Sequence, residues 1–366
     1  MESNTVTRYL GVIEGFYGRP WSFEARADYA NFLPQAGLNS YIYAPKSDAK
    51  LRRDWRKPWS DAELSALQRC CEKFRASGVQ VGFGLSPVGI SDAARRGRFD
   101  RADQLALQRK LEQIAILSDD FLCLLFDDIP TTGRDMAVWQ LHLCDTVRSF
   151  GTAQRLIVCP SYYSSDPRLE QLFGERPPHY WRQLGEGLDS DIDFFWTGEA
   201  VCSKHYSEDN LHFIAEQLRR RPVLWDNYPV NDGAISSQYL QLRPFAAAGF
   251  LSQLTAGHFS NPMNQPYLSQ IPLSSLAPLY GGEAASVSGE VELQWQAFMQ
   301  RQLGRDLAAQ LGEDVALFQD DGLASLSAAQ RQALSARYRQ HDHRCAKEIV
   351  DWLEGRYAFD PACLTG

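Results

Sequence analysis

The amino-acid sequence predicts an α/β protein, a (β/α)8 TIM barrel with a C-terminal helical extension. Over the first three-quarters of the 366 residues, short apolar segments rich in β-forming residues alternate with longer segments of helical periodicity. This alternation is typical of βα units around a parallel sheet. After about residue 283, helical patterns follow one another with no convincing strand between them. We therefore expect a barrel over residues 1–282 and a helical region over residues 283–366.

Eight segments are predicted to form the strands of the barrel. They are Leu10–Phe16, Ser40–Ala44, Val79–Leu85, Phe121–Phe126, Leu156–Cys159, Ile192–Trp196, Val223–Trp225 and Gly249–Leu254. Eight parallel strands favour a closed barrel over an open sheet. A dinucleotide-binding sheet would need Gly-x-Gly-x-x-Gly after its first strand, and Gly11–Gly18 does not supply that pattern.

The segments between these strands have helical patterns. The clearest are Ser60–Ala76, Arg101–Leu117, Met136–Phe150 and Glu208–Arg219. Ser60 followed by Glu63 indicates a capping box, and Gly78 stands where a helix would end. Three more helices are predicted in the C-terminal region, at Val291–Leu311, Ala328–His341 and Cys345–Leu353. We expect this region to pack on the barrel or to mediate self-association as a homodimer.

Composition and charge narrow the classes of function. The chain is 44% hydrophobic, 22% charged and 12% aromatic, which is typical of a globular enzyme. Its formal net charge is -8, and the densest basic groups, Arg95–Arg98 and Arg219–Arg221, are too short to follow a phosphate backbone. We therefore expect no nucleic-acid partner.

The N-terminal residues and the cysteines indicate a cytoplasmic protein. Met1–Thr5 has no basic segment followed by an apolar stretch, and no run approaches the roughly 18 apolar residues that span a membrane. The eight cysteines are scattered, and several, such as Cys123 and Cys159, lie inside apolar runs. This pattern is typical of reduced, buried thiols rather than a disulfide framework. We expect no signal peptide, no membrane partner and a cytoplasmic location.

The strongest local signal is a pair of adjacent carboxylates at the end of the fourth predicted strand. The apolar segment Phe121–Phe126 runs directly into Asp127 and Asp128. Two neighbouring, partly desolvated acids resist ionising together, so one keeps its proton while the other stays charged. The protonated acid can donate to a leaving oxygen, and the ionised one can stabilise positive charge. The pair therefore indicates acid/base catalysis.

Polar and aromatic side chains follow the other predicted strands. These segments are Glu14–Trp21, Lys46, Cys159–Tyr163, Trp196–Gly198, Trp225–Asp232 and Asn261–Asn264. Barrel enzymes carry their chemistry at the carboxyl ends of their strands, so we expect these side chains to meet at one mouth. Asparagine, aspartate, lysine and aromatic rings are suited to holding a neutral, hydroxyl-rich ring. The sequence therefore predicts a sugar-binding mouth.

Several of these features have other interpretations. Asp127 and Asp128 could cap a helix, or bind Mg²⁺ or Mn²⁺ in a metal-dependent hydrolase, and Asn227 and Asn261 could merely stabilise turns. His341–Cys345 contains metal-ligand residue types, but positions two apart on a helix do not share a face. The sequence has neither a Gly-x-x-x-x-Gly-Lys phosphate loop nor a His-Glu-x-x-His zinc motif. We therefore expect no metal and no cofactor.

Three segments resemble the hallmarks of glycoside hydrolase family 84, the O-GlcNAcases and bacterial β-N-acetylglucosaminidases. They are Gly11–Trp21 (GVIEGFYGRPW), Tyr43–Lys46 (YAPK) and Phe126–Ile129 (FDDI). The resemblance continues through the later strand ends and covers about residues 8 to 270. The first segment is long and highly specific, whereas Asp-Asp alone would be weak.

The resemblance implies a role for each matching residue. Asp128 matches the family's general acid/base, and Asp127 matches the carboxylate that holds and polarises the acetamido N–H of the substrate. Gly15, Lys46, Asp232 and Asn261 are implied to meet ring hydroxyls. The residues implied to surround the acetamide are Tyr163, Trp225 and Asn227, with Cys159 lining its pocket. Two positions depart from the family's pattern: Tyr162 and Ser47 stand where acidic residues are common.

The adjacent carboxylates suggest a substrate-assisted mechanism. Most retaining glycosidases place two carboxyl groups on opposite sides of the bond, which neighbours on one strand end cannot readily do. The expected activity is therefore retaining hydrolysis of β-linked GlcNAc from a GlcNAc-containing glycoconjugate, through an oxazoline intermediate. The alternatives are the metal-dependent hydrolase and a glycan-binding barrel without turnover.

Overall fold

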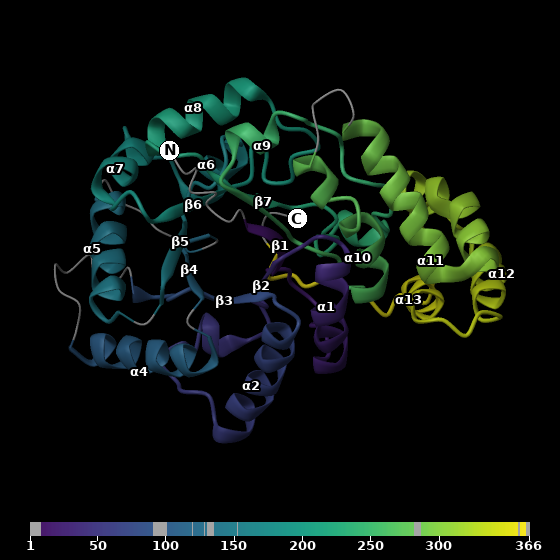
Figure 1. The fold of residues 1–366 in the computed structure, drawn as a ribbon, viewed down its shortest axis with the longest axis horizontal. Coiled ribbons are helices and arrows are strands. Elements are labelled where there is room, and N and C mark those ends of the chain that lie inside the picture. The colour runs from purple at the N-terminus through teal and green to yellow at the C-terminus, as the bar shows by residue number, and fades with distance from the viewer. Residues whose placement is uncertain are drawn as a thin grey trace.

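The computed structural model shows a closed barrel of eight parallel strands (Figure 1). It describes residues 9–90, 101–118, 120–127, 129, 135–151, 153–281, 287–357 and 359–363. Each strand pairs in parallel with the next one along the chain, and the eighth pairs with the first. The strands are β1 (Tyr9–Glu14), β2 (Ser40–Tyr43), β3 (Gln80–Leu85), β4 (Phe121–Leu125), β5 (Arg155–Cys159), β6 (Asp193–Trp196), β7 (Val223–Asp226) and β8 (Gly257–Ser260). The predicted (β/α)8 barrel is confirmed.

Helices follow the strands and surround the barrel (Figure 1). They are α1 (Phe23–Gln35), α2 (Asp61–Ala76), α4 (Arg101–Leu117), α5 (Met136–Ser149), α6 (Pro167–Phe173), α7 (Tyr180–Gly187), α8 (Glu208–Leu218), α9 (Leu251–Leu254) and α10 (Pro266–Leu273). The capping box at the start of α2 forms as predicted, with Ser60 and Glu63 bonded to each other's backbone. The same helix ends just before Gly78, whose φ of +74° suits a glycine.

The prediction of Gly249–Leu254 as the eighth strand is wrong. Leu251–Leu254 forms the one-turn helix α9, and the strand is Gly257–Ser260. An apolar run of this length has no periodicity that separates a strand from a buried helical turn. The real strand is hard to recognise because it contains Gly257 and His258, neither of which favours a strand. His258 is nevertheless fully buried, with its Nε2 3.0 Å from Oδ2 of Asp226 on β7.

Three long helices form the region that follows the barrel. They are α11 (Val287–Ala316), which is broken at Gly304, α12 (Ala328–Tyr338) and α13 (Arg344–Leu353). Figure 1 places them on one side of the barrel, beyond α10. The buried carboxylate of Glu348 on α13 accepts hydrogen bonds from the backbone N–H groups of Tyr267 and Leu268, at 3.1 and 2.8 Å. These donors lie in the first turn of α10, so the Glu348 side chain caps this helix from α13.

None of the helices in the described part of the chain combines the length and apolarity that a membrane span needs.

A buried ion pair connects α1 to the end of β1. The side chain of Glu14 is fully buried, and its two oxygens accept hydrogen bonds from Nε and Nη2 of Arg26 at 2.8 and 2.6 Å. The hydroxyl of Tyr41 on β2 also donates to Glu14. Glu14 therefore supports the barrel rather than facing the mouth, although it adjoins the site residue Gly15.

Removing the charge of Glu14 is expected to destabilise the protein. Glu14→Gln leaves the buried Arg26 guanidinium without its counter-charge, and breaking a buried pair costs about 3–5 kcal/mol. Urea-induced unfolding, followed by circular dichroism, measures the free energy of unfolding. Glu72→Gln, at an exposed position on α2, is the matched control and should change it by less than about 0.5 kcal/mol. Equal effects of the two substitutions would contradict the structural importance of the buried pair.

Candidate active site

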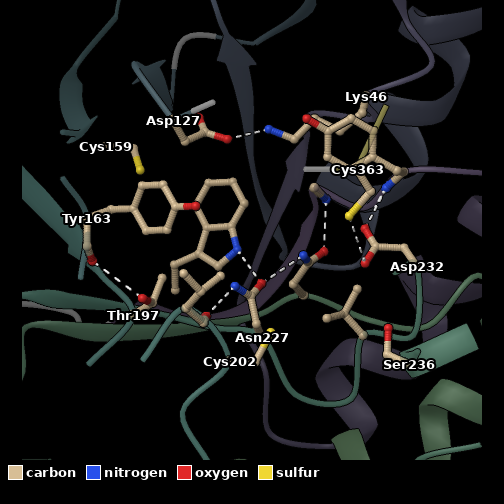
Figure 2. Close-up of a pocket in the computed structure, with 16 residues that line it drawn as sticks. Lys46, Asp127, Cys159, Tyr163, Thr197, Cys202, Asn227, Asp232, Ser236 and Cys363 are labelled. Atoms are coloured by element: carbon tan, nitrogen blue, oxygen red, sulfur yellow. Dashed lines mark hydrogen bonds and ion pairs between the residues drawn. The ribbon is translucent and has the colours of Figure 1, made fainter. Parts of the chain in front are cut away.

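A pocket opens at the carboxyl ends of the barrel strands (Figure 2). It contains every predicted site residue that the structure describes, namely Gly15, Lys46, Asp127, Cys159, Tyr163, Trp225, Asn227, Asp232 and Asn261. These residues come from the ends of six strands, so the barrel fold is what brings them together. Asp128, the predicted general acid/base, lies outside the described residues.

Asp127 lies at the inner wall of the pocket, directly after the buried strand β4. Its side chain is 9% exposed and forms an ion pair, through Oδ2, with the ammonium group of Lys46, which is 3% exposed. The other carboxylate oxygen, Oδ1, is buried and accepts no hydrogen bond from the described residues. Buried carboxylate oxygens normally have a donor, so this atom has an unused acceptor position at the pocket.

The charges around Asp127 keep it ionised. Burial raises the pKa of Asp127, but the positive charges of Lys46 and Arg52 and the hydrogen bond from Lys46 lower it by more. The net pKa is therefore below the usual value of an aspartate. In a metal-dependent hydrolase, a bound Mg²⁺ or Mn²⁺ would provide the positive charge beside Asp127. Here the ammonium group of Lys46 provides it.

Replacing Lys46 by methionine is expected to move the acid limb of the pH–activity profile to higher pH. Without the ammonium group, two of the interactions that lower the pKa of Asp127 are lost, so the pKa rises and Asp127 becomes protonated at a pH at which the wild type still holds it ionised. The profile of kcat/KM against pH for an aryl N-acetylglucosaminide measures the shift, with each profile scaled to its own maximum. Lys50→Met removes a partly exposed lysine of the same loop and should leave the acid limb unchanged. An unshifted limb in Lys46→Met would show that Lys46 does not control this ionisation.

Asn227 connects three parts of the pocket. Its Oδ1 accepts hydrogen bonds from Nε1 of Trp225 and Nδ2 of Asn261, each at 3.0 Å. Its Nδ2 donates to the carbonyl oxygen of Val201 at 2.7 Å. Figure 2 shows the Asn227 amide at the base of the pocket. Because three of its hydrogen-bonding positions are used within the protein, Asn227 fixes the ends of β7 and β8 and the loop after β6.

Gly15 allows the Trp225 ring to reach the pocket. A Cβ atom at Gly15 would lie 2.5 Å from Cζ2 of Trp225, far inside van der Waals contact. The backbone N–H of Gly15 also donates to Oδ1 of Asn261 at 3.2 Å. Glycine is therefore required here for the close approach of the Trp225 ring.

Asp232 lies across the pocket from Cys159 and Tyr163 (Figure 2). Its Oδ2 accepts a hydrogen bond from the backbone N–H of Tyr17 at 2.8 Å, so it connects the loops after β1 and β7. The Sγ of Cys363 lies 3.9 Å from its Oδ1. Carboxylate, amide and aromatic groups thus line the pocket on several sides. Such a lining suits a polar ligand that has an apolar face.

Sequence reasoning missed several residues of the pocket wall. They are Tyr17, Thr197, Val201, Cys202, Val230, Ser236 and Cys363. Tyr17, Thr197 and Val230 lie inside the polar and aromatic segments noted at the strand ends, so that signal could have found them. Cys202 and Cys363 lie in irregular segments with no pattern that marks a site. Cys363 shows that the region after the barrel contributes to the pocket.

The histidines of His341–Cys345 have structural roles. Nδ1 of His343 accepts a hydrogen bond from the backbone N–H of Cys345 and caps α13, and its Nε2 lies 3.1 Å from the carbonyl oxygen of Gln302. Nε2 of His341 lies 3.2 Å from Oε1 of Gln310. Within the described residues, no three His, Cys, Asp or Glu side chains gather in a way that could hold a metal ion.

The fold and the pocket define a (β/α)8 barrel protein with a small polar and aromatic site at the carboxyl ends of its strands. The chain belongs to the β-N-acetylglucosaminidase family, whose model matches residues 10–313. The Protein O-GlcNAcases of Mus musculus and Rattus norvegicus are each 29% identical to it over 299 residues, which is 78% of this chain and 31% of each relative. The chain thus spans about a third of the length of these curated relatives.

A solved structure agrees with this family assignment. A mutant of the O-GlcNAc hydrolase from Thermobaculum terrenum superposes with a TM-score of 0.74 at 28% sequence identity. The match covers 95% of this chain and 81% of the other. The similarity therefore extends past the barrel into the helical region.

Proposed function

We propose that this chain is a retaining β-N-acetylglucosaminidase that removes terminal β-linked GlcNAc from a glycoconjugate. The observation that carries the proposal is the carboxylate of Asp127, with Oδ2 held by Lys46 and Oδ1 buried without a donor among the described residues. Leaving a buried acceptor unpaired costs free energy, so a bound ligand that supplies an N–H is favoured. The acetamido N–H of GlcNAc is such a donor. Family membership supports the same reaction class.

The proposed mechanism uses the acetamido group of the substrate as the nucleophile. Its carbonyl oxygen attacks the anomeric carbon, and the bond from that carbon to the leaving oxygen breaks. Asp128, protonated, gives its proton to the leaving oxygen, while ionised Asp127 stabilises the positive charge that develops on the amide nitrogen. Asp128 then takes a proton from water, the water oxygen bonds to the anomeric carbon and the oxazoline opens. Two displacements at one carbon retain its configuration.

The remaining pocket residues are proposed to hold the sugar. Gly15, Lys46, Asp232 and Asn261 would meet the ring hydroxyls, and Tyr163, Trp225, Asn227 and Cys159 would surround the acetamide. Asp232 lies across the pocket from Cys159 and Tyr163, and Asn227 connects the two sets through its hydrogen bond from Asn261. Neither set forms a binding surface alone, so the sugar would connect the two walls.

The similarity to the Protein O-GlcNAcases and to an O-GlcNAc hydrolase supports O-GlcNAc on protein serine or threonine as the proposed natural substrate. A cytoplasmic location is also proposed, because none of the eight cysteines, all of which the structure describes, forms a disulfide, as expected in a reducing compartment. Self-association through the helical region stays a prediction that analytical ultracentrifugation can test.

The test is turnover of 4-nitrophenyl β-N-acetylglucosaminide, with the first-formed anomer identified by proton NMR. The proposal expects the β-anomer first, and slower turnover when fluorine replaces the acetamido methyl hydrogens, because the carbonyl oxygen then becomes a weaker nucleophile. Binding without turnover would identify a glycan-binding barrel. Activity abolished by exhaustive chelation and restored by Mg²⁺ or Mn²⁺ would favour the metal-dependent hydrolase. An α-anomer formed first would contradict retention.

A further inference from the structure

The pairing of β4 with β5 changes its donor at the residue that precedes Asp127. The backbone N–H of Phe126 donates to the carbonyl oxygen of Cys159 at 2.9 Å, as in a regular parallel ladder. In such a ladder the carbonyl oxygen of Phe126 would next accept from the backbone N–H of Ser161. Instead the Ser161 hydroxyl donates to this oxygen at 3.2 Å, while the Ser161 N–H donates to the hydroxyl of Tyr180 at 3.0 Å. A side chain thus replaces a backbone donor directly beside the site.

The Ser161 hydroxyl belongs to a closed ring of hydrogen bonds. Nε2 of Gln140 on α5 donates to Oγ of Ser161 at 2.8 Å. Oε1 of Gln140 accepts from the hydroxyl of Tyr180, at the start of α7, at 2.5 Å. The Tyr180 hydroxyl in turn accepts the bond from the Ser161 N–H. Because Gln140 already donates to Oγ of Ser161, the proton of this hydroxyl is directed to the carbonyl oxygen of Phe126.

This ring is buried between the barrel and its helices. Gln140, Ser161 and Tyr180 are each at most 1% exposed, and α5 and α7 lie beside each other outside the barrel (Figure 1). Moving polar groups out of water costs free energy, which their hydrogen bonds offset only in part. Apolar side chains would fill the same space without that cost, whereas a fully bonded polar ring holds its members in one arrangement. The ring is therefore suited to fixing the direction of the Phe126 carbonyl group.

Fixing this carbonyl group also fixes the peptide that leads to Asp127. A peptide group is planar, so the carbonyl oxygen of Phe126 and the Cα of Asp127 lie in one plane. The carboxylate of Asp127 extends from that Cα to its ion pair with Lys46 through Oδ2. The ion pair holds only one carboxylate oxygen, and Oδ1 has no donor among the described residues. The peptide plane therefore helps to set the position from which Asp127 reaches a ligand.

We propose that Ser161, held by Gln140 and Tyr180, is a positioning residue for Asp127, an assignment that rests on the proposed function of the sugar pocket. Ser161 is buried behind the pocket and acts through the Phe126 carbonyl group, not on the substrate. Without its hydroxyl this carbonyl loses the donor that orients it. Asp127 then loses its alignment with the acetamide nitrogen, and a misplacement of about 1 Å can slow a reaction by about 100-fold.

The experiment is a double-mutant cycle that measures kcat/KM on 4-nitrophenyl β-N-acetylglucosaminide. Ser161→Ala is expected to lower kcat/KM by about 10- to 100-fold in the wild-type background. In the Asp127→Ala background the same substitution should change it by less than about twofold, because the residue through which Ser161 acts is absent. A merely structural role would lower kcat/KM by the same factor in both backgrounds, and that outcome would overturn the proposal.

Two further variants separate positioning from folding. Ser118→Ala is the matched control, because Ser118 is also buried and its hydroxyl donates to a strand carbonyl oxygen, that of Val81 near the start of β3, at 2.7 Å. The urea midpoint of unfolding should fall in both serine variants, whereas Ser118→Ala should keep kcat/KM within about twofold. Equal losses of activity in Ser118→Ala and Ser161→Ala would leave Ser161 a structural role alone.

Tyr180→Phe tests the ring without removing the Ser161 hydroxyl. The bond from Ser161 to Phe126 remains but its support is weakened, so the loss of kcat/KM should be smaller than in Ser161→Ala. This loss should also vanish in the Asp127→Ala background. Wild-type kcat/KM in both Tyr180→Phe and Ser161→Ala would contradict the proposal. Absence of aryl turnover in the wild type would instead contradict the proposed function.

Discussion

Asp127→Ala is expected to lower kcat/KM by about 100- to 1000-fold on every N-acetylglucosaminide, whatever its leaving group. The reason is that, in the proposed mechanism, Asp127 acts on the acetamide, whose nitrogen becomes positive as the oxazoline forms, and not on the leaving oxygen. The buried ion pair with Lys46 keeps the carboxylate negative and aligned before the reaction begins. The measurement is kcat/KM on a series of aryl and alkyl glycosides whose leaving groups differ in acidity.

The controls separate loss of charge from loss of fold. Asp127→Asn keeps the size of the side chain but removes its charge, so it should lose nearly as much activity as Asp127→Ala. Asp342→Ala removes an exposed aspartate of the loop before α13 and should leave kcat/KM unchanged. A loss confined to poor leaving groups would mean that Asp127 donates a proton to the leaving oxygen, and the two carboxylates would then exchange roles.

The barrel was predictable because its strands are buried on both faces. β4, for example, is buried at all five positions, and its sequence is a continuous apolar run. Such a short, fully apolar run is typical of a strand in a parallel sheet that is covered on both faces. The site residues were predictable for a related reason. Polar side chains such as Lys46 and Asp127 stand directly after apolar strands, and parallel strands place such positions together at one mouth.

The elements that escaped prediction depend on tertiary contacts. β8 is recognisable only once Asp226 is known to pair with His258, and once Gly257 is seen to lie where a Cβ would come within 2.8 Å of the Tyr9 carbonyl oxygen. The position of Cys363 beside Asp232 is another example. Cys363 follows α13 in the chain, and α13 is held against α10 by Glu348, which binds the backbone of Leu268, 80 positions away. This packing brings Cys363 to Asp232. No local pattern of residues encodes such contacts.

The neighbour of Asp127 should respond differently to mutation, because the two carboxylates are assigned to different atoms of the substrate. Asp128→Ala is expected to lower kcat/KM by about 100- to 10,000-fold on substrates with poor leaving groups, such as alkyl glycosides and glycopeptides. On 2,4-dinitrophenyl β-N-acetylglucosaminide the loss in kcat/KM should be much smaller, since that leaving group departs as a stable anion without a proton. The measurement is the slope of log kcat/KM against leaving-group pKa, which should steepen in the variant.

The difference in slope between Asp128→Ala and Asp127→Ala tests the two assigned roles more directly than the loss of activity in either variant. A disrupted pocket would lower all rates together and leave the slope unchanged, so the slope reports proton donation rather than folding. Asp127→Ala is the matched comparison, because it removes the adjacent residue of the same type and should keep the wild-type slope. If the two variants gave the same slope, one carboxylate could not be the proton donor while the other holds the amide. The substrate-assisted mechanism would then lack its acid, and a two-carboxyl or metal-bound arrangement would have to supply it.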